Sequence, residues 1–543
     1  MHPQMLSDES TRLNLPRSAI SLPKPAPLDP PESTLMTPGG GETLGRRRRD
    51  WIASLMGGAL GPLGESRHVR YRDPVLALVH RITHGFTLAE YERARALGFE
   101  GYLEEQLDHL SIDDSAMDPV LARFPAIEMS PKELLDNYPT RPDILQGALK
   151  VALIARATSS RRQLFERMCE FWIDHFNIDH NKGPAAYTLP EHERLVIRRH
   201  ALGSFPDMLK ACAFSGAMLY YLDNWLNVKS APQNNYAREL LELHTLSVHG
   251  GYHNGDVDEV AKCFTGWTLV GDASSPDWLR GVFDPTLHTH GQKLVLGHVI
   301  GGTPRFARPG QPEPRDEALA VLEILGAHPS TAEFLARKLI SRFLNPTPPQ
   351  HLVEKVAERY LATGGDIKAM LRAILTRENL SEHSKVLGPK YRRPFHLVIS
   401  AFRALDGTIK GNAFSTLDLL AGMGHSPYDY EPPTGYPDGF RDWGGLLIPR
   451  WTFSATVFRY GVTMPGLAFI TGADLQAKLE IHVPSDRPGL AQRMNERLFG
   501  ERLSRREVEI LQEFIDTYPD DFDLFALYDS MALASSLPGF QWY

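Results

Sequence analysis

The sequence predicts a mainly α-helical protein, arranged as two helical lobes with a small insert of loop and β-hairpin. After residue 74, apolar residues recur at intervals of three and four along most of the chain, as they do on one face of an α-helix. This pattern stops for a long stretch in residues 271–312, where glycine and proline are frequent and the segment Lys-Leu-Val-Leu at 293–296 is typical of a strand. A length of 543 residues, 42% of them hydrophobic, is enough to bury more than one core.

The predicted organisation has four parts. Residues 1–65 are rich in Pro, Ser, Thr and Gly and lack apolar periodicity, so we expect a disordered arm that cannot offset its ordering entropy. The N-terminal helical lobe is expected to span residues 66–270 and the insert residues 271–312. The C-terminal helical lobe, residues 313–543, contains a loop rich in Pro, Gly and aromatic residues at 422–443.

Within the N-terminal lobe, the apolar spacing predicts two helices between residues 74 and 107 and two more between 150 and 176. A further helix at 236–246 has an apolar stripe opposite a strongly polar face. Asp256 and Glu259 have the spacing of a capping box, so the next helix is expected to begin near Val257.

The helical pattern returns in the C-terminal lobe. Prolines at 346, 348 and 349 and the glycine pair at 364 and 365 are expected to separate its first helices. The predicted helices lie at about 319–325, 334–344, 351–361, 367–380, 450–460, 486–499 and 504–535.

Composition argues against several classes of protein. A net charge of -8 does not indicate the excess of positive charge that is typical of nucleic-acid-binding proteins, so we expect no nucleic-acid partner. No run of about 18 apolar residues is present, so we expect no integral membrane segment. The P-loop, GxGxxG, HExxH, GxSxG and kinase motifs are all missing. The three cysteines, Cys169, Cys212 and Cys263, lie in apolar-periodic stretches and are expected to be buried and unpaired.

A basic segment at the end of the arm leaves two locations open. Arg48 and Arg49, followed by Asp50-Trp51-Ile52 and a weakly apolar stretch, resemble a twin-arginine export signal, which implies a periplasmic protein. The long Pro-rich lead and the missing small-x-small cleavage site favour a cytoplasmic protein with a basic arm.

Carboxylates on predicted helices are the first candidates for chemistry. Asn235, Glu239 and Glu242 are spaced to share one helix face, and two neighbouring carboxylates can share a metal or divide acid and base roles. The alternative is a surface salt bridge between Arg238 and Glu242, worth less than about 1 kcal/mol. A second row, Glu166, Glu170 and Asp174, requires counter-charges, and Arg162 and Arg167 are the nearest in sequence.

Histidines and aromatic residues form the other candidates. His288 and His290 are spaced i, i+2 in an extended loop, so both rings point the same way, as metal ligands require. His175, His180, His200 and His244 lie on or near predicted helices, where a structural role is the simpler interpretation. The aromatic loop, with Tyr428, Tyr430, Tyr436 and Trp443, is suited either to line a groove for sugars or polymer chains or to form a rigid lid.

Several stretches of the chain are similar to the recurring motifs of the bacterial family called domain of unknown function 1800. The resemblance begins near residues 80–87, runs past Arg450 and is carried by FWIDHF (171–176), RRHALGSFPDML (198–209), MLYYLDN (218–224), the long stretch 234–267, FDPTLHTHGQKLVLG (283–297) and HPSTAEFLARKLISRF (328–343). It implies a mainly helical protein with no established reaction, often exported and often encoded beside a sulfatase-like partner. The family's recurrent positions correspond here to His175, His200, Asn235, Arg238, Glu239, Glu242, Trp267, Asp284, His288 and Lys293.

Three positions depart from the family pattern: Asn234 stands where the family usually has Glu, Thr289 where it has Asp, and Tyr436 where it tends to have Trp. The loss of the two acidic positions weakens the expectation of a multi-carboxylate metal site.

Two function classes follow from these residues. The first is a hydrolase-type enzyme, with or without a divalent metal, acting on an extracytoplasmic polymer or glycoconjugate. Its predicted catalytic residues are Glu239, Glu242, His175 and His200, its substrate-binding residues Asn235, Arg238, Trp267, Lys293, Tyr436 and Trp443, and its metal ligands His288, His290 and Asp284. The alternative is a non-catalytic binding or assembly module that partners the co-encoded sulfatase-like protein. Convergence of the acidic and imidazole groups beside one cleft would favour the enzyme.

Overall fold

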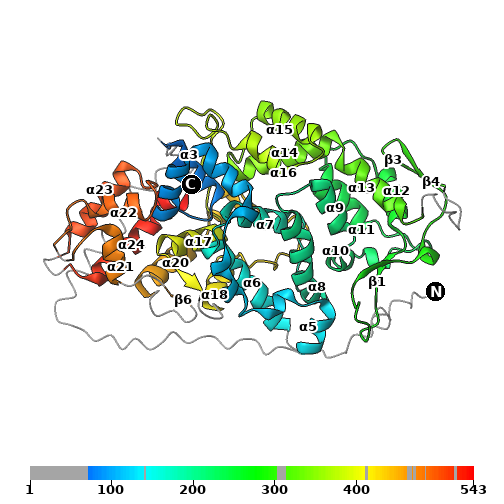
Figure 1. Cartoon of the computed structure of the whole chain (residues 1–543), viewed down its shortest axis with the longest axis horizontal. Coiled ribbons are helices and arrows are strands. Elements are labelled where there is room, and N and C mark those ends of the chain that lie inside the picture. The colour runs from blue at the N-terminus through cyan, green and yellow to red at the C-terminus, as the bar shows by residue number, and fades with distance from the viewer. Residues whose placement is uncertain are drawn as a thin grey trace, which may run out of the picture. The chain divides into compact units, whose positions relative to one another are not determined.

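The computed structural model describes residues 71, 73–139, 142–302, 313–409, 414–460, 467–468, 472–483, 485–518 and 522–543. Most of these residues lie in helices, and the strands form three short antiparallel pairs, so the mainly α-helical fold is confirmed (Figure 1). The predicted arm, residues 1–65, and its twin-arginine-like segment lie outside the described residues. Val69–Tyr543 group into one compact unit, and the division into two lobes stays a prediction.

The first two helix pairs lie where the apolar spacing places them. They are α2 (Pro74–Ile82) with α3 (Leu88–Leu107), and α6 (Pro142–Ser159) with α7 (Gln163–His175). The Asp73 carboxylate accepts the Val75 N–H at 2.8 Å and so caps α2. Between the pairs lie short helices: η2 (His109–Ser111), η3 (Ser115–Met117), α4 (Asp118–Leu121), η4 (Pro125–Glu128) and α5 (Pro131–Asn137).

Two of the following helices change from α to π geometry. Helix α8 (Ala185–His192) continues into the π-helix η5 (Glu193–Arg198), and α11 (Asn235–Glu239) continues into η7 (Leu240–Thr245). The predicted helix at 236–246 is therefore present, but it widens just after Glu239. Such π segments often occur at functional sites. The neighbouring elements are α9 (Phe205–Ala213), α10 (Gly216–Tyr221) and η6 (Asn224–Leu226).

Helix α12 (Asn254–Phe264) begins three residues earlier than the capping-box spacing predicts. The Asp256 carboxylate accepts the His253 N–H at 2.9 Å, so Asp256 lies inside the first turn instead of before it. The predicted hairpin is confirmed as β3 (Gln292–Val295) paired with β4 (His298–Gly301), and an extra pair, β1 (Trp267–Leu269) with β2 (Gly281–Phe283), precedes it. The short helix η8 (Pro285–Leu287) links the two pairs, and residues 303–312 of the insert lie outside the described residues.

The C-terminal part is helical as predicted, with one split and several additions. The single helix predicted at 504–535 is two helices, α23 (Arg505–Asp516) and α24 (Leu524–Ser536). Helix α17 (Pro394–Ala404) was not predicted, and it buries its polar residues His396, Ser400 and Arg403 together with its apolar ones. The remaining elements are α13 (Asp316–Gly326), α14 (Pro329–Phe343), α15 (Gln350–Ala362), α16 (Ile367–Ile374), β5 (Thr408–Ile409) paired with β6 (Leu467–Ala468), α18 (Phe414–Gly422), α19 (Phe440–Trp443), α20 (Leu447–Tyr460), α21 (Gly472–Leu479), α22 (Leu490–Arg497) and α25 (Pro538–Gln541).

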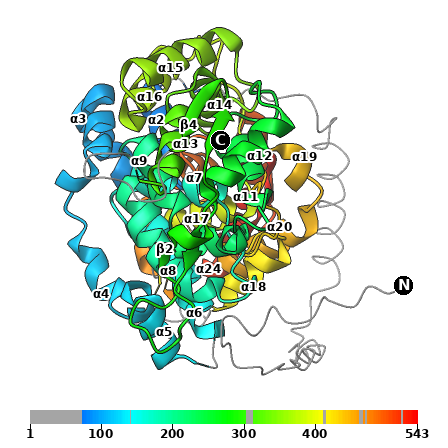
Figure 2. The same ribbon diagram turned by 90° about the vertical axis from the view of Figure 1, so that its right-hand side faces the viewer.

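Helices α7 and α17 both lie in the central part of the views in Figures 1 and 2, and the Arg167 guanidinium on α7 contacts the His396 ring on α17 at 2.9 Å. All three cysteines are buried and unpaired, as predicted. In the part of the chain that the structure describes, no helix is both long enough and apolar enough to cross a bilayer.

Candidate functional site

The row of carboxylates on α7 lies in a buried charge network. Glu170 accepts hydrogen bonds from Arg342 and Arg393, each at 2.6 Å, and its carboxylate lies 3.2 Å from His84 Nε2. Burial favours the neutral acid, but the two guanidinium groups outweigh it and hold the pKa of Glu170 well below its usual range. Asp174 pairs with Arg393 at 2.6 Å.

The counter-charges of this row differ from those expected. Arg162 donates to the Ile112 carbonyl and Arg167 contacts His396, so neither hydrogen-bonds to the row, although the charge of Arg167 acts on Glu170. Glu166 instead pairs with Arg198 at 2.7 Å. The partners come from distant helices, because the side chains of α7 point into the interior where those helices meet it.

His84, Glu170 and His396 bring three ligand atoms within 4.8 Å of one another, which is the spacing of a metal site. Arg342 and Arg393 already occupy both oxygens of the Glu170 carboxylate. A divalent cation would therefore lie against two guanidinium charges in a buried environment, where charge repulsion is strong. We interpret this group as part of the structural core.

His175 and His288 are also buried and use both ring nitrogens within the protein. His175 Nε2 lies 3.1 Å from the His244 carbonyl oxygen, and Nδ1 accepts from Lys338 at 2.9 Å. Burial, reinforced by Lys338, holds the pKa of His175 well below its usual value. His288 Nδ1 lies 2.7 Å from the Thr265 carbonyl oxygen, and Nε2 lies 3.1 Å from Glu317, which also pairs with Lys293.

The other two predicted metal ligands lie near His288 without joining it in a three-ligand group. The ring of His290 is 5.8 Å from that of His288, and Asp284 accepts the Thr286 N–H at 2.8 Å to cap a short helix. Among the described residues, the groups with three ligand atoms within 4.8 Å are His84, Glu170 and His396, and Asp179, His180 and Asp429.

Glu239 and Glu242 are half-buried and near one another. Burial first, and then the charge of Glu242, raise the pKa of Glu239, while Arg238 lowers it. Glu242 accepts from the Tyr252 hydroxyl at 3.3 Å, and Asn235 donates to Asp223 at 3.3 Å. This raised pKa is compatible with a proton-carrying role for Glu239.

The remaining predicted residues have varied surroundings. His200 is half-buried, and burial followed by the nearby Arg199 lowers its pKa. Trp267 stacks on Phe214 with ring centroids 4.0 Å apart. Trp443 donates from Nε1 to the Pro437 carbonyl at 2.8 Å, and its ring stacks on that of His425.

A different set of side chains meets where the loop after α7 contacts the aromatic loop. We call Lys150, Asp179, His180, Ser426 and Asp429 the loop site. Lys150 Nζ lies 2.9 Å from Ser426 Oγ, 3.0 Å from His180 Nε2 and 3.7 Å from the Asp429 carboxylate. His180 Nε2 also lies 3.2 Å from Asp429. Lys150 therefore contacts three other side-chain types used in acid–base and nucleophilic chemistry: a serine, a histidine and a carboxylate.

The backbone around the loop site is held in place by specific hydrogen bonds. His180 N–H donates to the Tyr428 carbonyl at 2.9 Å, and the Asn177 amide donates to the Tyr430 and Pro432 carbonyls at 2.7 and 2.9 Å. Tyr428 has φ of 62°, a strained value for a non-glycine residue, of the kind that occurs at functional sites. The Tyr436 hydroxyl donates to the Ser426 carbonyl at 2.9 Å, so the loop folds back on itself.

The pKa values of Lys150 and Asp429 in the loop site are both lower than usual. Burial lowers the pKa of Lys150, and the neighbouring Asp429 partly offsets this. The hydrogen bond from His180 holds the pKa of Asp429 far below its usual range, with Lys150 adding to the effect. Lys150 is buried while Asp429 is exposed, so the group reaches from the interior to the solvent.

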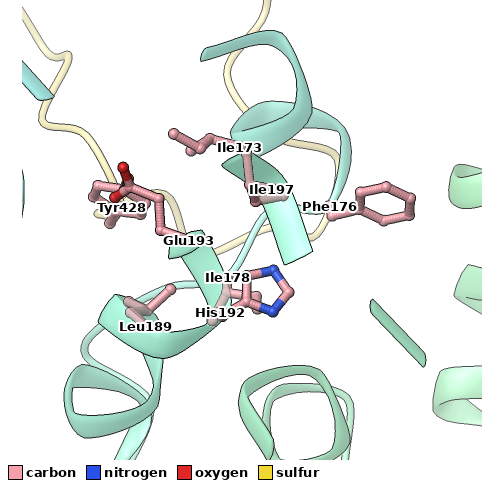
Figure 3. A pocket seen from close by; sticks show the side chains of 8 residues that line it. All are labelled: Ile173, Phe176, Ile178, Leu189, His192, Glu193, Ile197 and Tyr428. Atoms are coloured by element: carbon pink, nitrogen blue, oxygen red, sulfur yellow. Dashed lines mark hydrogen bonds between the residues drawn. The ribbon is translucent and has the colours of Figure 1, made fainter. Parts of the chain in front are cut away.

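A small cavity lies beneath this loop (Figure 3). It has about 10 Å³ of free space, which is room for one water molecule and excludes a substrate. The Tyr428 hydroxyl donates to Glu193 at 2.7 Å beside it, and among the described residues the buried Nε2 of His192 has no hydrogen-bond partner. Because almost all of the surface that faces this space is apolar, we expect the cavity to stay dry.

Gly435 is the residue that allows the aromatic loop to lie against α7. Its φ is 71°, and a Cβ there would lie 2.0 Å from the Asp174 carbonyl oxygen. We expect Gly435→Ala to cost at least about 1–3 kcal/mol and to release the loop. Hydrogen exchange should become faster in peptides covering residues 425–436. Gly445→Ala, where the Cβ meets open space, is the matched control, and equal exchange in the two variants would contradict this account.

Sequence reasoning identified only part of the loop site. His180 and the aromatic loop were singled out, whereas Lys150, Asp179, Ser426 and Asp429 were not. The one local signal was the polar run Asn-Ile-Asp-His-Asn-Lys at 177–182, directly after an apolar helix. Lys150 and Ser426 are 276 residues apart, so no local pattern connects them.

The fold and the loop site define a mainly helical protein in which a buried lysine of α6 meets a serine, a histidine and carboxylates from two facing loops. The chain belongs to the family described as "Protein of unknown function (DUF1800)", which matches residues 77–542. The resemblance seen in the sequence motifs is thereby confirmed. No curated protein and no solved structure matches the chain.

Proposed function

We propose that the protein is a hydrolase of ester or amide bonds in which Ser426 is the nucleophile and Lys150 its general base. The observation that supports this is the 2.9 Å separation of Lys150 Nζ from Ser426 Oγ, at a lysine whose pKa is lowered by burial. Serine is a weak nucleophile unless a base accepts its proton, and a lysine serves when desolvation favours its neutral form.

The proposed reaction has two steps. Ser426 Oγ bonds to the carbonyl carbon while its proton passes to Lys150 Nζ, and the leaving group departs with that proton. Water then attacks the carbonyl carbon of the acyl-serine and gives a proton to Lys150. The bond to Ser426 Oγ breaks, the free acid leaves, and Lys150 returns the proton to restore the serine hydroxyl. His180 and Asp429, within 3.0 and 3.7 Å of Lys150 Nζ, would orient the amine.

The surroundings of Ser426 bear on the class of substrate. The rings of Tyr430 and Tyr436 lie 4.5 Å apart, and both are half-buried beside the site. Flat aromatic surfaces next to a reacting group suit sugars, so an acyl group carried on a glycoconjugate or polymer is the substrate class that we propose.

A fluorophosphonate probe tests the proposal without knowledge of the substrate. Its phosphorus bonds to an activated serine and fluoride leaves, so peptide mass spectrometry should find the label on Ser426. We expect Ser426→Ala to abolish labelling and Lys150→Met to slow it about 100-fold or more, the usual contribution of a general base. Ser274→Ala is the matched control, because Ser274 is an exposed serine bonded to a carboxylate, at 2.8 Å, without a lysine.

Three outcomes would overturn the proposal. The first is no label on Ser426 in the folded protein, and the second is a Lys150→Met variant that labels at the wild-type rate. The third is a loss of labelling in Glu239→Gln that exceeds that in Lys150→Met. This third result would return the base role to the predicted pair Glu239 and Glu242.

The second candidate function is a non-catalytic binding or assembly module that partners a sulfatase-like protein. It is favoured by the burial of His175, His288 and Lys293, whose polar atoms are already used by protein groups. A chain that leaves Ser426 unlabelled but co-purifies with the sulfatase-like protein would support this module.

A further inference from the structure

A second polar pocket lies away from the loop site, between the short helices at 109–121 and the helices α7 and η5. Its volume is about 450 Å³, which is the size of a small-molecule site. The lining mixes charges of both signs with apolar side chains such as Ile112 and Met117. Its charged residues are Asp113, Asp114, Asp118, Arg162, Glu166 and Arg198, together with the buried Arg156.

The cations of this pocket differ in how well they are neutralised. Arg198 donates to both oxygens of Glu166, at 2.7 and 2.9 Å, and Arg156 donates to Glu193 at 2.9 Å. Arg162 instead donates from Nε and Nη2 to the carbonyl oxygen of Ile112, at 3.2 and 2.9 Å. Because a carbonyl carries no net charge, the Arg162 guanidinium has no hydrogen-bonded counter-ion, and its charge acts at longer range on the carboxylates of Asp113 and Asp114.

The carboxylates of the pocket also differ in how many of their hydrogen bonds are already made within the protein. Asp114 is already bonded to the Ser160 hydroxyl and the Arg161 N–H, both at 2.8 Å. Asp113 and Asp118 are exposed at the rim, and Asp113 accepts the uncharged Ser115 N–H at 3.0 Å, while Arg161 and Arg162 act on its charge from further away. Negative charge is therefore available on one short segment and positive charge on Arg162.

We infer that this pocket binds a small zwitterion, with its ammonium group beside Asp113 and Asp118 and its carboxylate beside Arg162. The rim carboxylates would repel a simple anion, and the guanidinium groups would repel a simple cation. A ligand with both charges satisfies both sets of groups.

This site does not depend on the proposed function, although the two share a structural link. Glu193 accepts from both Arg156, at the pocket, and Tyr428, two residues from Ser426, at 2.9 and 2.7 Å. Figure 3 shows Glu193 and Tyr428 beside one another. Binding is measured directly below, so the result stands whether or not Ser426 is reactive.

Calorimetric titration of the full chain with α-amino acids and dipeptides tests the inference. We expect at least one zwitterion to bind with a dissociation constant of about 1 mM or lower. Its N-acetylated and amidated forms, which each lack one charge, should bind at least about tenfold more weakly. Arg162→Gln and the double variant Asp113→Asn, Asp118→Asn should weaken binding by a similar factor. Arg372→Gln, which removes an exposed arginine bonded to Glu104, is the matched control.

The inference is overturned if no zwitterion of the panel binds. It is also overturned if the N-acetylated form binds as tightly as its parent, which would indicate a plain anion site. Equal affinity in the wild type and Arg162→Gln, with both proteins folded by circular dichroism, would place the ligand elsewhere.

Discussion

Replacing Glu170 by glutamine is expected to lower the free energy of unfolding by about 3–5 kcal/mol, because it leaves buried arginines without their shared counter-charge. Arg342 and Arg393 each donate to this carboxylate at 2.6 Å, and all three side chains are almost completely buried. Glutamine keeps the size of the side chain but turns an N–H₂ group toward one guanidinium. Urea titration at neutral pH, followed by circular dichroism, measures the loss.

Glu104→Gln is the matched control for this result. Glu104 also accepts a bidentate arginine, Arg372, with both distances 2.7 Å, but about half of each side chain is exposed. Exposed ion pairs contribute about 1 kcal/mol or less. If both substitutions cost the same, the charge network on α7 does not stabilise the fold in the way described.

The helices could be predicted because their signal is local. The apolar spacing that identifies α2, α3, α6 and α7 depends only on residues within a few turns of one another. Two of the misses have physical causes. Helix α17 buries its polar face, His396, Ser400 and Arg403, so it lacks the solvent-exposed side typical of a surface helix, and α12 starts earlier than expected because Asp256 acts inside its first turn.

The candidate site could be predicted only in part, because its contacts join distant segments. The sequence showed that the acidic row on α7 needs counter-charges, yet Arg342 and Arg393 lie 172 and 223 residues from Glu170. Periodicity identifies which face of a helix is buried, but not which distant side chain meets it. The same limit explains why Glu239 was identified while Lys150 and Ser426 were not.

Acid is expected to unfold the protein well above the pH at which its carboxylates titrate. Seven buried histidines have lowered pKa values, with burial as the first cause in each: His80, His84, His175, His192, His244, His396 and His425. The pKa is about 4 for His84 and about 3 for His192 and His244. In the unfolded chain these rings bind protons near pH 6.5.

The sign of the effect follows from this difference. Above pH 6.5 both states carry neutral rings, and the histidines leave stability unchanged with pH. Below pH 6.5 the histidine rings bind protons in the unfolded chain but not in the folded protein. The free energy of unfolding therefore falls until the pH reaches the pKa of the rings in the folded protein. At pH 4 the rings of His84, His192 and His244 each cost about 3 kcal/mol, at 1.36 kcal/mol per pKa unit, and together these costs are comparable to a typical folding free energy of about 5–15 kcal/mol.

We therefore expect the urea midpoint to stay level from pH 8 to about 6.5 and then to fall steeply, with unfolding between about pH 4 and 6 in the absence of urea. His192→Gln should reduce the slope of the unfolding free energy against pH below pH 6. The reduction should correspond to about one proton fewer taken up on unfolding, because the His192 ring is buried and has one of the lowered pKa values. His298→Gln, at an exposed position of β4, should leave the slope unchanged. A urea midpoint that stays level down to pH 4.5 would contradict this account. It would mean that water reaches these histidine rings in the folded protein through the packing around α7 and α17.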